Sequence, residues 1–184
     1  KIKKIDPSIC VIHYVAPSVW AWRENRAKKM SKYIDHVLAL LPFEPKYMKR
    51  ADLSCDFVGH PIVSRNIPNQ KEVALLRNSF NLNENNLIVT LLPGSRKNEI
   101  KKMKSVYTEF VKIVKKNFPN IVFILPSPSG VHDLIKDWVE KERLPIIHIS
   151  EKNKKASEFK LQKQVIFSSS VLALATSGTV SLEL

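Results

Sequence analysis

Several features that would assign a protein class at once are missing from this chain of 184 residues. It has no run of about 20 apolar residues, so no segment is expected to span a bilayer. The phosphate-binding patterns GxxxxGK[ST] and GxGxxG are both absent. There are no internal repeats and no low-complexity tracts. If the chain has a nucleotide site, it must therefore be recognised from other sequence features.

Cysteine is scarce, with Cys10 and Cys55 alone on apolar, strand-like stretches. Neither has a His or Cys partner at metal-ligand spacing, and we expect both to be buried free thiols in a reducing compartment. A cytoplasmic location fits. The chain begins at Lys1 without a secretory signal and ends at Leu184, inside what looks like the first turn of a helix. We interpret it as an internal fragment of a longer protein.

Negative charge is also in short supply, because 17 acidic residues face 30 basic ones and leave a net charge of +13. Such a field attracts nucleic acid, anionic lipid headgroups or a phosphorylated substrate. Lysines on solvated helix faces produce the same excess. Charge alone therefore does not choose among these partners.

What the chain does contain is a regular alternation of apolar runs and amphipathic stretches. This order is typical of parallel βαβ units and predicts an α/β fold. The order predicts two α/β halves joined near an aperiodic, proline-containing linker at 61–68. The run at 9–15 is apolar enough to predict a strand covered on both faces. We expect strands and helices at these ranges: strands 9–15, 36–41, 56–58, 87–92, 121–125 (ended by Pro126), 146–149 and 171–175; helices 20–33, 43–50, 69–81, 97–118 and 131–143, and a further helix reached near 165–167 after a polar loop from 150.

The most informative stretch is the junction at 87–100, where an apolar run ends in Pro-Gly-Ser-Arg and a helical pattern starts at once. A strand that breaks at Gly94 and reopens as a helix presents free backbone N–H groups and a positive dipole end. Arg96 adds a planar cationic fork. The arrangement suits a phosphate or diphosphate, although an ordinary strand–helix turn with an exposed Arg96 fits the same residues. Glu99, in the first helical turn, is expected to cap the helix rather than take part in chemistry.

A second junction follows the run at 171–175, in Ser177-Gly178-Thr179. Its hydroxyls and N–H groups can hold a diphosphate or merely cap a helix. In a parallel sheet both junctions should open on one edge. Glu183 comes about one helical turn later, where it can accept hydrogen bonds from sugar hydroxyls or lie on the helix surface.

Trp20 and Trp22 precede a basic stretch that includes Arg23 and Arg26. These residues suit a membrane interface, with aromatics at headgroup level and cations on anionic lipid. Packing of the tryptophans into the protein is the interpretation we favour.

Several phrases, in collinear order over nearly the whole chain, resemble signature stretches of the lipid-A-disaccharide synthase family of glycosyltransferases. The phrases are YVAPSVWAWR at 14–23, LLPFE at 40–44, FVGHP at 57–61, LLPGSR with Glu99-Ile100 at 91–100, and Ser177-Gly178-Thr179 with Leu182-Glu183.

This resemblance implies a GT-B fold, in which two Rossmann-like domains face a cleft. Residues 1–62 would form the C-terminal part of the acceptor-side domain, and residues 63–184 the N-terminal part of the UDP-sugar donor domain. The implied reaction joins UDP-2,3-diacylglucosamine to 2,3-diacylglucosamine 1-phosphate with inversion, giving the lipid A disaccharide 1-phosphate and UDP, without a metal or cofactor. Because both substrates carry acyl chains, the enzyme would contact the inner face of the cytoplasmic membrane peripherally and would not bind nucleic acid.

The resemblance also assigns roles to residues. Gly94, Ser95 and Arg96 would face the donor diphosphate, with Arg96 stabilising the leaving group. The remaining predicted donor contacts are Ser177, Gly178, Thr179 and Glu183, the last near the ribose. The general base would lie outside this chain, so the fragment alone is not expected to be active. The alternatives are another GT-B UDP-sugar transferase or epimerase, a non-catalytic remnant, and a basic nucleic-acid-binding domain.

Overall fold

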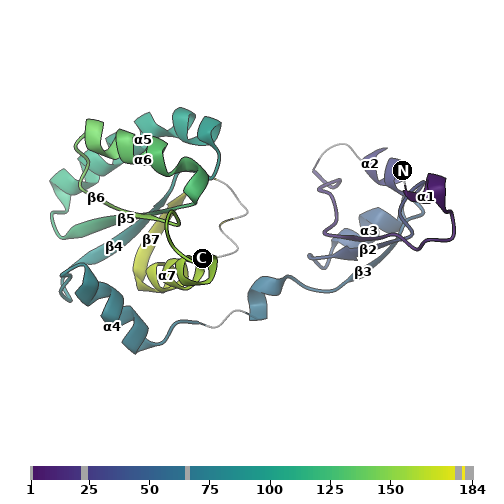
Figure 1. Ribbon diagram of the computed structural model, residues 1–184, viewed down its shortest axis with the longest axis horizontal. Helices are drawn as coiled ribbons and strands as arrows, with labels where there is room; N and C mark the ends of the chain where they lie inside the picture. The colour runs from purple at the N-terminus through teal and green to yellow at the C-terminus, as the bar shows by residue number, and fades with distance from the viewer. Residues whose placement is uncertain (1, 22–24, 65–66, 177–179, 181–184) are drawn as a thin grey trace. The chain divides into compact units, whose positions relative to one another are not determined.

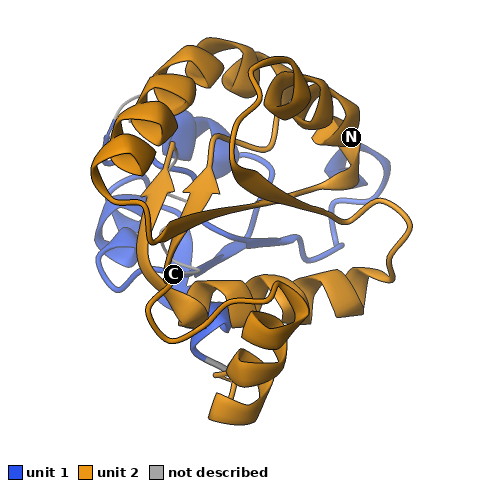
Figure 2. Ribbon diagram, turned by 90° about the vertical axis from the view of Figure 1, so that its left-hand side faces the viewer, with its two compact units in different colours: residues 1–65 blue, residues 66–184 orange. Residues whose placement is uncertain are grey.

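The computed structural model describes residues 2–21, 25–64, 67–176 and 180. The chain divides into two compact units, residues 1–65 and 66–184, which Figure 2 colours blue and orange. Each unit is an α/β structure with its own parallel sheet (Figure 1). The fold class predicted from the sequence is confirmed.

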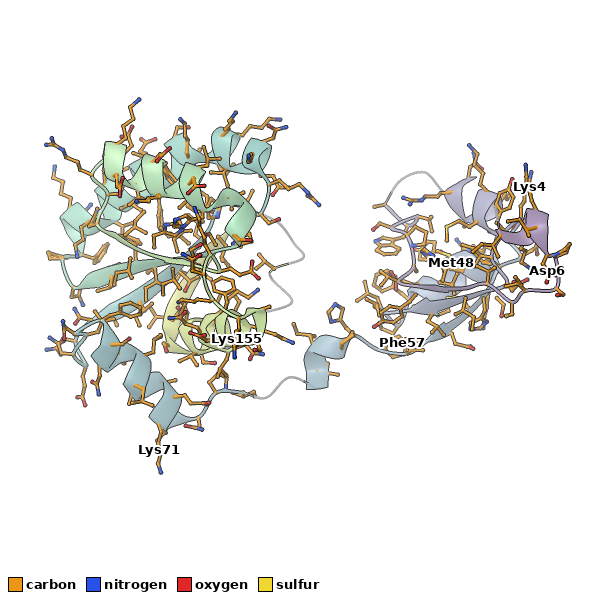
Figure 3. All side chains as sticks on the ribbon, viewed as in Figure 1. Lys4, Asp6, Met48, Phe57, Lys71 and Lys155 are labelled. Carbon is orange, nitrogen blue, oxygen red and sulfur yellow. The ribbon has the colours of Figure 1, made fainter. Side chains whose placement is uncertain are left out.

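The first unit holds a three-stranded parallel sheet in the order β1-β2-β3. Its elements are α1 (Ile2–Ile5), β1 (Ile12–Tyr14), α2 (Asn25–Met30), β2 (His36–Ala39), α3 (Glu44–Lys49), β3 (Ser54–Phe57) and the 3₁₀ helix η1 (Pro61–Ser64). The core lies between the sheet and its helices, where Met48 of α3 is fully buried (Figure 3). The 61–68 segment thus begins as a short helix, and the predicted division after residue 62 falls inside it.

Two expectations for this unit are wrong. The strand predicted at 9–15 is only three residues long, and Ile12 and Tyr14 are 58% and 50% exposed, because β1 is the edge strand of the described sheet. Cys10, just before it, is exposed, whereas Cys55 is buried in β3 as predicted. Burial raises the pKa of the Cys55 thiol, and the charge of Glu44 adds to that effect.

The second unit holds a four-stranded parallel sheet in the order β6-β5-β4-β7. Helices α5 and α6 cover one face of this sheet, and α4 and α7 the other (Figure 1). Its elements are α4 (Gln70–Ser79), β4 (Leu87–Leu92), α5 (Lys97–Asn117), β5 (Ile121–Ser127), η2 (Ser129–Val131), α6 (His132–Lys141), β6 (Ile146–Ser150), α7 (Ala156–Ser169) and β7 (Ser170–Ala175). The helices predicted at 69–81, 97–118 and 131–143 are confirmed.

Local chemistry explains where these helices begin and which face they bury. Asn69 caps α4 by accepting a hydrogen bond from the Glu72 N–H at 3.1 Å, and the Glu72 carboxylate accepts from the Asn69 N–H at 2.8 Å. In α5, Ile100, Tyr107 and Val111 recur at helical spacing and are fully buried against the sheet. The lysines between them remain on the outer side.

One strand runs further than predicted. Pro126, expected to end the run at 121–125, lies within β5 and pairs with Ile149 of β6. Proline lacks the N–H that a central strand normally donates. It is tolerated here because the pairing of β5 with β4 on its other side ends at Ile124.

Candidate functional site

The turn between β4 and α5 is a tight loop that only glycine fits. Gly94 has a φ of +122°, in the region that side-chain-bearing residues rarely adopt. A Cβ added there would lie 2.7 Å from both the Cβ and Oε2 of Glu99. Gly94 therefore lets the backbone pass close to the first turn of α5, as the strand–Gly–helix pattern predicted.

The Glu99 carboxylate occupies the position at the start of α5 where the sequence predicted a phosphate. Its Oε2 accepts hydrogen bonds from the N–H groups of Ser95 at 3.0 Å and Arg96 at 3.2 Å. The capping role predicted for Glu99 is confirmed. In this structure the two N–H groups are thus held by an internal carboxylate and are not free for a phosphate.

The same carboxylate also holds Arg96. One guanidinium nitrogen of Arg96 donates to Glu99 Oε1 at 2.7 Å, while 80% of the Arg96 side chain stays exposed. The hydrogen bond from Arg96, followed by that from the Ser95 N–H, lowers the pKa of Glu99, which keeps the carboxylate ionised at neutral pH. Because the Arg96–Glu99 ion pair is in contact with water, it is weak. Another anion can therefore take the place of Glu99 as the partner of Arg96.

A cavity of about 400 Å³ lies beside this turn, at the carboxyl edge of the second sheet. Ligands of open parallel sheets bind at this edge. Its wall draws on the ends of β4 and β5, the residue after β6 and the first turns of α7. The lining residues are Leu92, Gly94, Ser95, Pro126, Pro128, Glu151, Ala156, Phe159, Lys160, Lys163 and Val180.

Two of the predicted site residues, Gly94 and Ser95, thus line the cavity, whereas Arg96 beside them does not. Ser177, Gly178, Thr179 and Glu183 lie outside the described residues. The strands that lead to the two predicted turns are nevertheless neighbours, because β4 pairs with β7 through Leu92 and Ala175.

Sequence reasoning missed the opposite wall of the cavity. From the sequence, Lys160 and Lys163 of α7 were counted only in the overall positive charge, yet they line the cavity together with the buried Phe159. The signal available was positional, since α7 starts just after the carboxyl end of β6. The expectation that ligands bind near the carboxyl ends of parallel strands would have included Lys160 and Lys163, whereas the net charge does not single them out.

A further polar group lies beneath the turns. Tyr107 is 1% exposed, and its Oη is 3.1 Å from the Leu92 carbonyl oxygen and 3.0 Å from that of Leu174. The Thr176 hydroxyl is 3.1 Å from the same phenol oxygen. From the sequence, Tyr107 was predicted only as one of the apolar positions of the helix at 97–118.

A second hollow, of about 430 Å³, lies between α5 and α6 and is lined in part by Lys104, Thr108, Glu109 and Trp138. It is made by the middle turns of α5 and by α6, away from any strand end or glycine turn. We therefore regard the cavity at the sheet edge as the candidate site.

In the first unit, Trp20 packs edge-on against Phe43, with ring centroids 5.0 Å apart, and lies 6.5 Å from Tyr47. The favoured packing interpretation is confirmed for Trp20, while Trp22 and Arg23 lie outside the described residues. Among the residues that the structure places, no helix has the length and apolarity to cross a membrane. Over the same residues, no group of three or more His, Cys, Asp or Glu side chains is arranged to hold a metal ion.

Comparison with known proteins agrees with this architecture. The chain aligns with the UDP-GlcNAc 2-epimerase of Neisseria meningitidis, whose structure holds UDP-GlcNAc, with a TM-score of 0.64 over 95% of this chain and 50% of that one. At 14% identity this likeness shows the fold alone, which is of the GT-B type.

Sequence comparison is more specific. The lipid-A-disaccharide synthase of Ruegeria pomeroyi is 39% identical over the whole chain, and that of Rickettsia conorii 35% identical. The chain spans less than half the length of these relatives, 46% and 39% respectively. The model of the lipid-A-disaccharide synthetase family matches residues 1–184. The chain therefore belongs to the lipid-A-disaccharide synthetase family of glycosyltransferases involved in lipid A biosynthesis.

Proposed function

We propose that the full-length protein transfers a diacylglucosaminyl group from its UDP conjugate to 2,3-diacylglucosamine 1-phosphate, with inversion, and releases UDP. Family membership supports this reaction. The observation that carries the site assignment is the cavity at the carboxyl edge of the second sheet, into which Gly94 and Ser95 open. The second unit would then hold the donor and the first unit the acceptor side.

The cavity has the chemistry that a nucleoside diphosphate needs. Lys160 and Lys163 supply positive charge on one wall, and the start of α5 supplies the positive end of a helix dipole on the other. Phe159 and the two prolines supply apolar surface beside these charges. A volume of about 400 Å³ falls within the range typical of small-molecule sites.

In the proposed mechanism, the acceptor hydroxyl attacks the anomeric carbon as the bond to the diphosphate breaks. The electron pair of that bond goes to the departing UDP, so negative charge grows on the diphosphate. Arg96 and the N–H groups of the turn would stabilise it, with diphosphate oxygens taking over donors that now contact Glu99. No residue of 1–184 is assigned as the base that accepts the hydroxyl proton.

Titration of UDP into the full-length protein tests this assignment. Arg96→Ala should weaken UDP binding by roughly 10- to 100-fold, since a hydrogen bond to a charged group contributes about 1.5–3 kcal/mol. It should also lower kcat by about 10²–10³-fold if Arg96 stabilises the leaving group.

Lys116→Ala is the matched control, because it removes the same charge from the exposed far end of α5. Equal UDP affinity in wild type and Arg96→Ala would contradict the role of Arg96. Absence of UDP binding in the wild type would contradict the donor site itself and favour a non-catalytic remnant. Release of UDP with another acceptor, or epimerisation of UDP-GlcNAc, would point to a different GT-B reaction.

A further inference from the structure

We propose that Tyr107 is a positioning residue whose hydroxyl holds the ends of β4 and β7 against each other and so sets the spacing between the turn at 93–96 and Thr176. The catalytic consequence of this role rests on the proposed donor site. The positioning itself is a property of the fold and can be tested without a ligand.

The contacts of Tyr107 lie where the two strands end. Leu92 is the last residue of β4 and precedes Gly94 by two positions. Leu174 is the penultimate residue of β7, and Thr176 immediately precedes Ser177. One phenol oxygen therefore contacts three groups at or just beyond the ends of two strands that lie far apart in the sequence.

The hydrogen-bonding capacity of a phenol explains how these contacts are shared. Tyr107 has a single hydroxyl hydrogen, which it can donate to either carbonyl, and its oxygen can accept from the Thr176 hydroxyl. The Thr176 N–H also donates to the Leu92 carbonyl at 3.1 Å. Tyr107, Leu92 and Thr176 thus form a closed network under the cavity edge.

Burial favours the neutral form of the Tyr107 phenol in this network. It raises the pKa of the Tyr107 phenol, against a smaller lowering by the Thr176 hydrogen bond. The phenol therefore remains a neutral donor throughout the physiological range. A buried hydroxyl without partners would be costly, and among the described residues Leu92, Leu174 and Thr176 supply its partners.

The aromatic ring is not what makes the position special. Phenylalanine would fill the same space, and α5 already buries Ile100 and Val111 without any polar group. What tyrosine adds is the link between α5 and both strands. Because Glu99 on the same helix holds the Ser95 and Arg96 N–H groups, a shift of α5 against β4 would also displace that turn.

The test uses Tyr107→Phe and Thr176→Val in the full-length protein. Thr108→Val is the matched control, because it removes a neighbouring hydrogen bond of α5, from Trp138 Nε1 at 2.9 Å, that leads to α6 and not to the strand ends. Amide hydrogen exchange of the Ser95 and Thr176 N–H groups is measured without ligand, and UDP affinity is measured separately.

We expect Tyr107→Phe and Thr176→Val to speed exchange at both amides about tenfold and to weaken UDP binding by about tenfold, below the ~10²-fold that a displacement of 1 Å can cost. Thr108→Val should change neither. The effects of Tyr107→Phe and Arg96→Ala on the free energy of UDP binding should also be less than additive. A displaced turn would already weaken the contact between Arg96 and UDP, so that removal of Arg96 costs less.

Unchanged exchange in Tyr107→Phe, or equal changes in Thr108→Val, would overturn the inference. Strictly additive effects of Tyr107→Phe and Arg96→Ala on UDP binding would mean that Tyr107 contributes only to general stability. That result would also overturn the inference. If the wild type fails to bind UDP, the proposed function fails, and the exchange data alone then decide the positioning role.

Discussion

Two glutamates hold equivalent strand–helix turns in the two units. Glu44 is 3% exposed and accepts hydrogen bonds from the N–H groups of Leu40 and Leu41, each at 2.9 Å. Glu99 accepts in the same way from Ser95 and Arg96. In both cases a carboxylate on the first turn of a helix satisfies backbone donors that no helical carbonyl can reach. The difference lies in exposure, since Glu99 and its partner Arg96 are open to water.

Gly94→Ala should damage the second of these turns. The new Cβ would lie 2.7 Å from two Glu99 atoms in a backbone conformation that alanine resists, so Glu99 must move and release the Ser95 and Arg96 N–H groups. We expect a loss of roughly 1–3 kcal/mol in the free energy of unfolding, measured with urea, and a loss of UDP binding.

Gly130→Ala provides the control in the same unit, because an added Cβ there meets nothing within 4 Å. Its stability should stay within about 0.5 kcal/mol of the wild type. If Gly94→Ala is equally well tolerated, the close approach to Glu99 is not a constraint on the turn.

At the scale of the element, strand and helix positions followed from residue patterns, whereas their chemistry often did not. Apolar runs located β4, β5 and β7, and the spacing of Ile100, Tyr107 and Val111 located α5. The same pattern hid the polar role of Tyr107, because periodicity records which side chains are buried and not what a buried hydroxyl contacts.

The errors have a common physical origin. Pro126 remains in β5 because its neighbour β4 ends its pairing earlier, and Cys10 is exposed because it precedes an edge strand. Both outcomes depend on which strands are neighbours, information that a local window does not contain. The Gly94 turn was predictable because strand, glycine and helix are contiguous. The wall formed by Lys160 and Lys163 was not, because it required the order of the sheet.

We expect the packing of α6 on β5 and β6 to make the second unit sensitive to acid. The His148 ring stacks on His132 with centroids 5.1 Å apart, and its Nε2 is 2.8 Å from Ser127 Oγ. Burial, followed by the charge of His132, lowers the pKa of His148 to about 4. In the unfolded chain the imidazole regains its usual pKa near 6.5.

The unfolded state therefore binds more protons between these two values, and stability falls as the pH drops from about 6.5 towards 4. The full shift would correspond to about 3 kcal/mol, and we expect about 1–2 because the ring is only partly buried. Urea unfolding at several pH values measures this slope, followed by Trp138 fluorescence in a background where Trp20, Trp22 and any tryptophan outside residues 1–184 are replaced by Phe.

His148→Gln should flatten the acid slope, and His13→Gln, an exposed position in the first unit, should leave it unchanged. A slope that survives in His148→Gln would assign the acid sensitivity to other groups, such as Glu99 with its lowered carboxyl pKa.

At the scale of the whole molecule, the net charge of +13 on these 184 residues favours anionic partners. We propose that the partner is the anionic surface of the membrane on which diacylated substrates would lie, since each Lys or Arg near such a surface contributes about 1 kcal/mol. Full-length protein should sediment with vesicles rich in phosphatidylglycerol and not with pure phosphatidylcholine. Binding should be lost near 1 M salt, where the Debye length is about 3 Å.

Equal binding to both vesicle types, or binding that salt does not weaken, would contradict an electrostatic contact. A gel shift with duplex DNA at the same salt concentrations is the parallel measurement. DNA binding that persists under conditions where vesicle binding is lost would favour nucleic acid as the partner.

The sheet order β6-β5-β4-β7 has a consequence for biosynthesis. Because β7 follows β5 and β6 in the sequence but lies against β4, this edge of β4 stays unpaired with β7 until residues 170–175 have left the ribosome. Until then the Tyr107 hydroxyl lacks two of its three partners, and the Thr90 hydroxyl lacks Ser170, 2.6 Å away in the finished fold. The cavity wall also needs Val180. The nascent chain thus completes its scaffold of α5, α6, β5 and β6 before it can assemble the place where a nucleotide would bind.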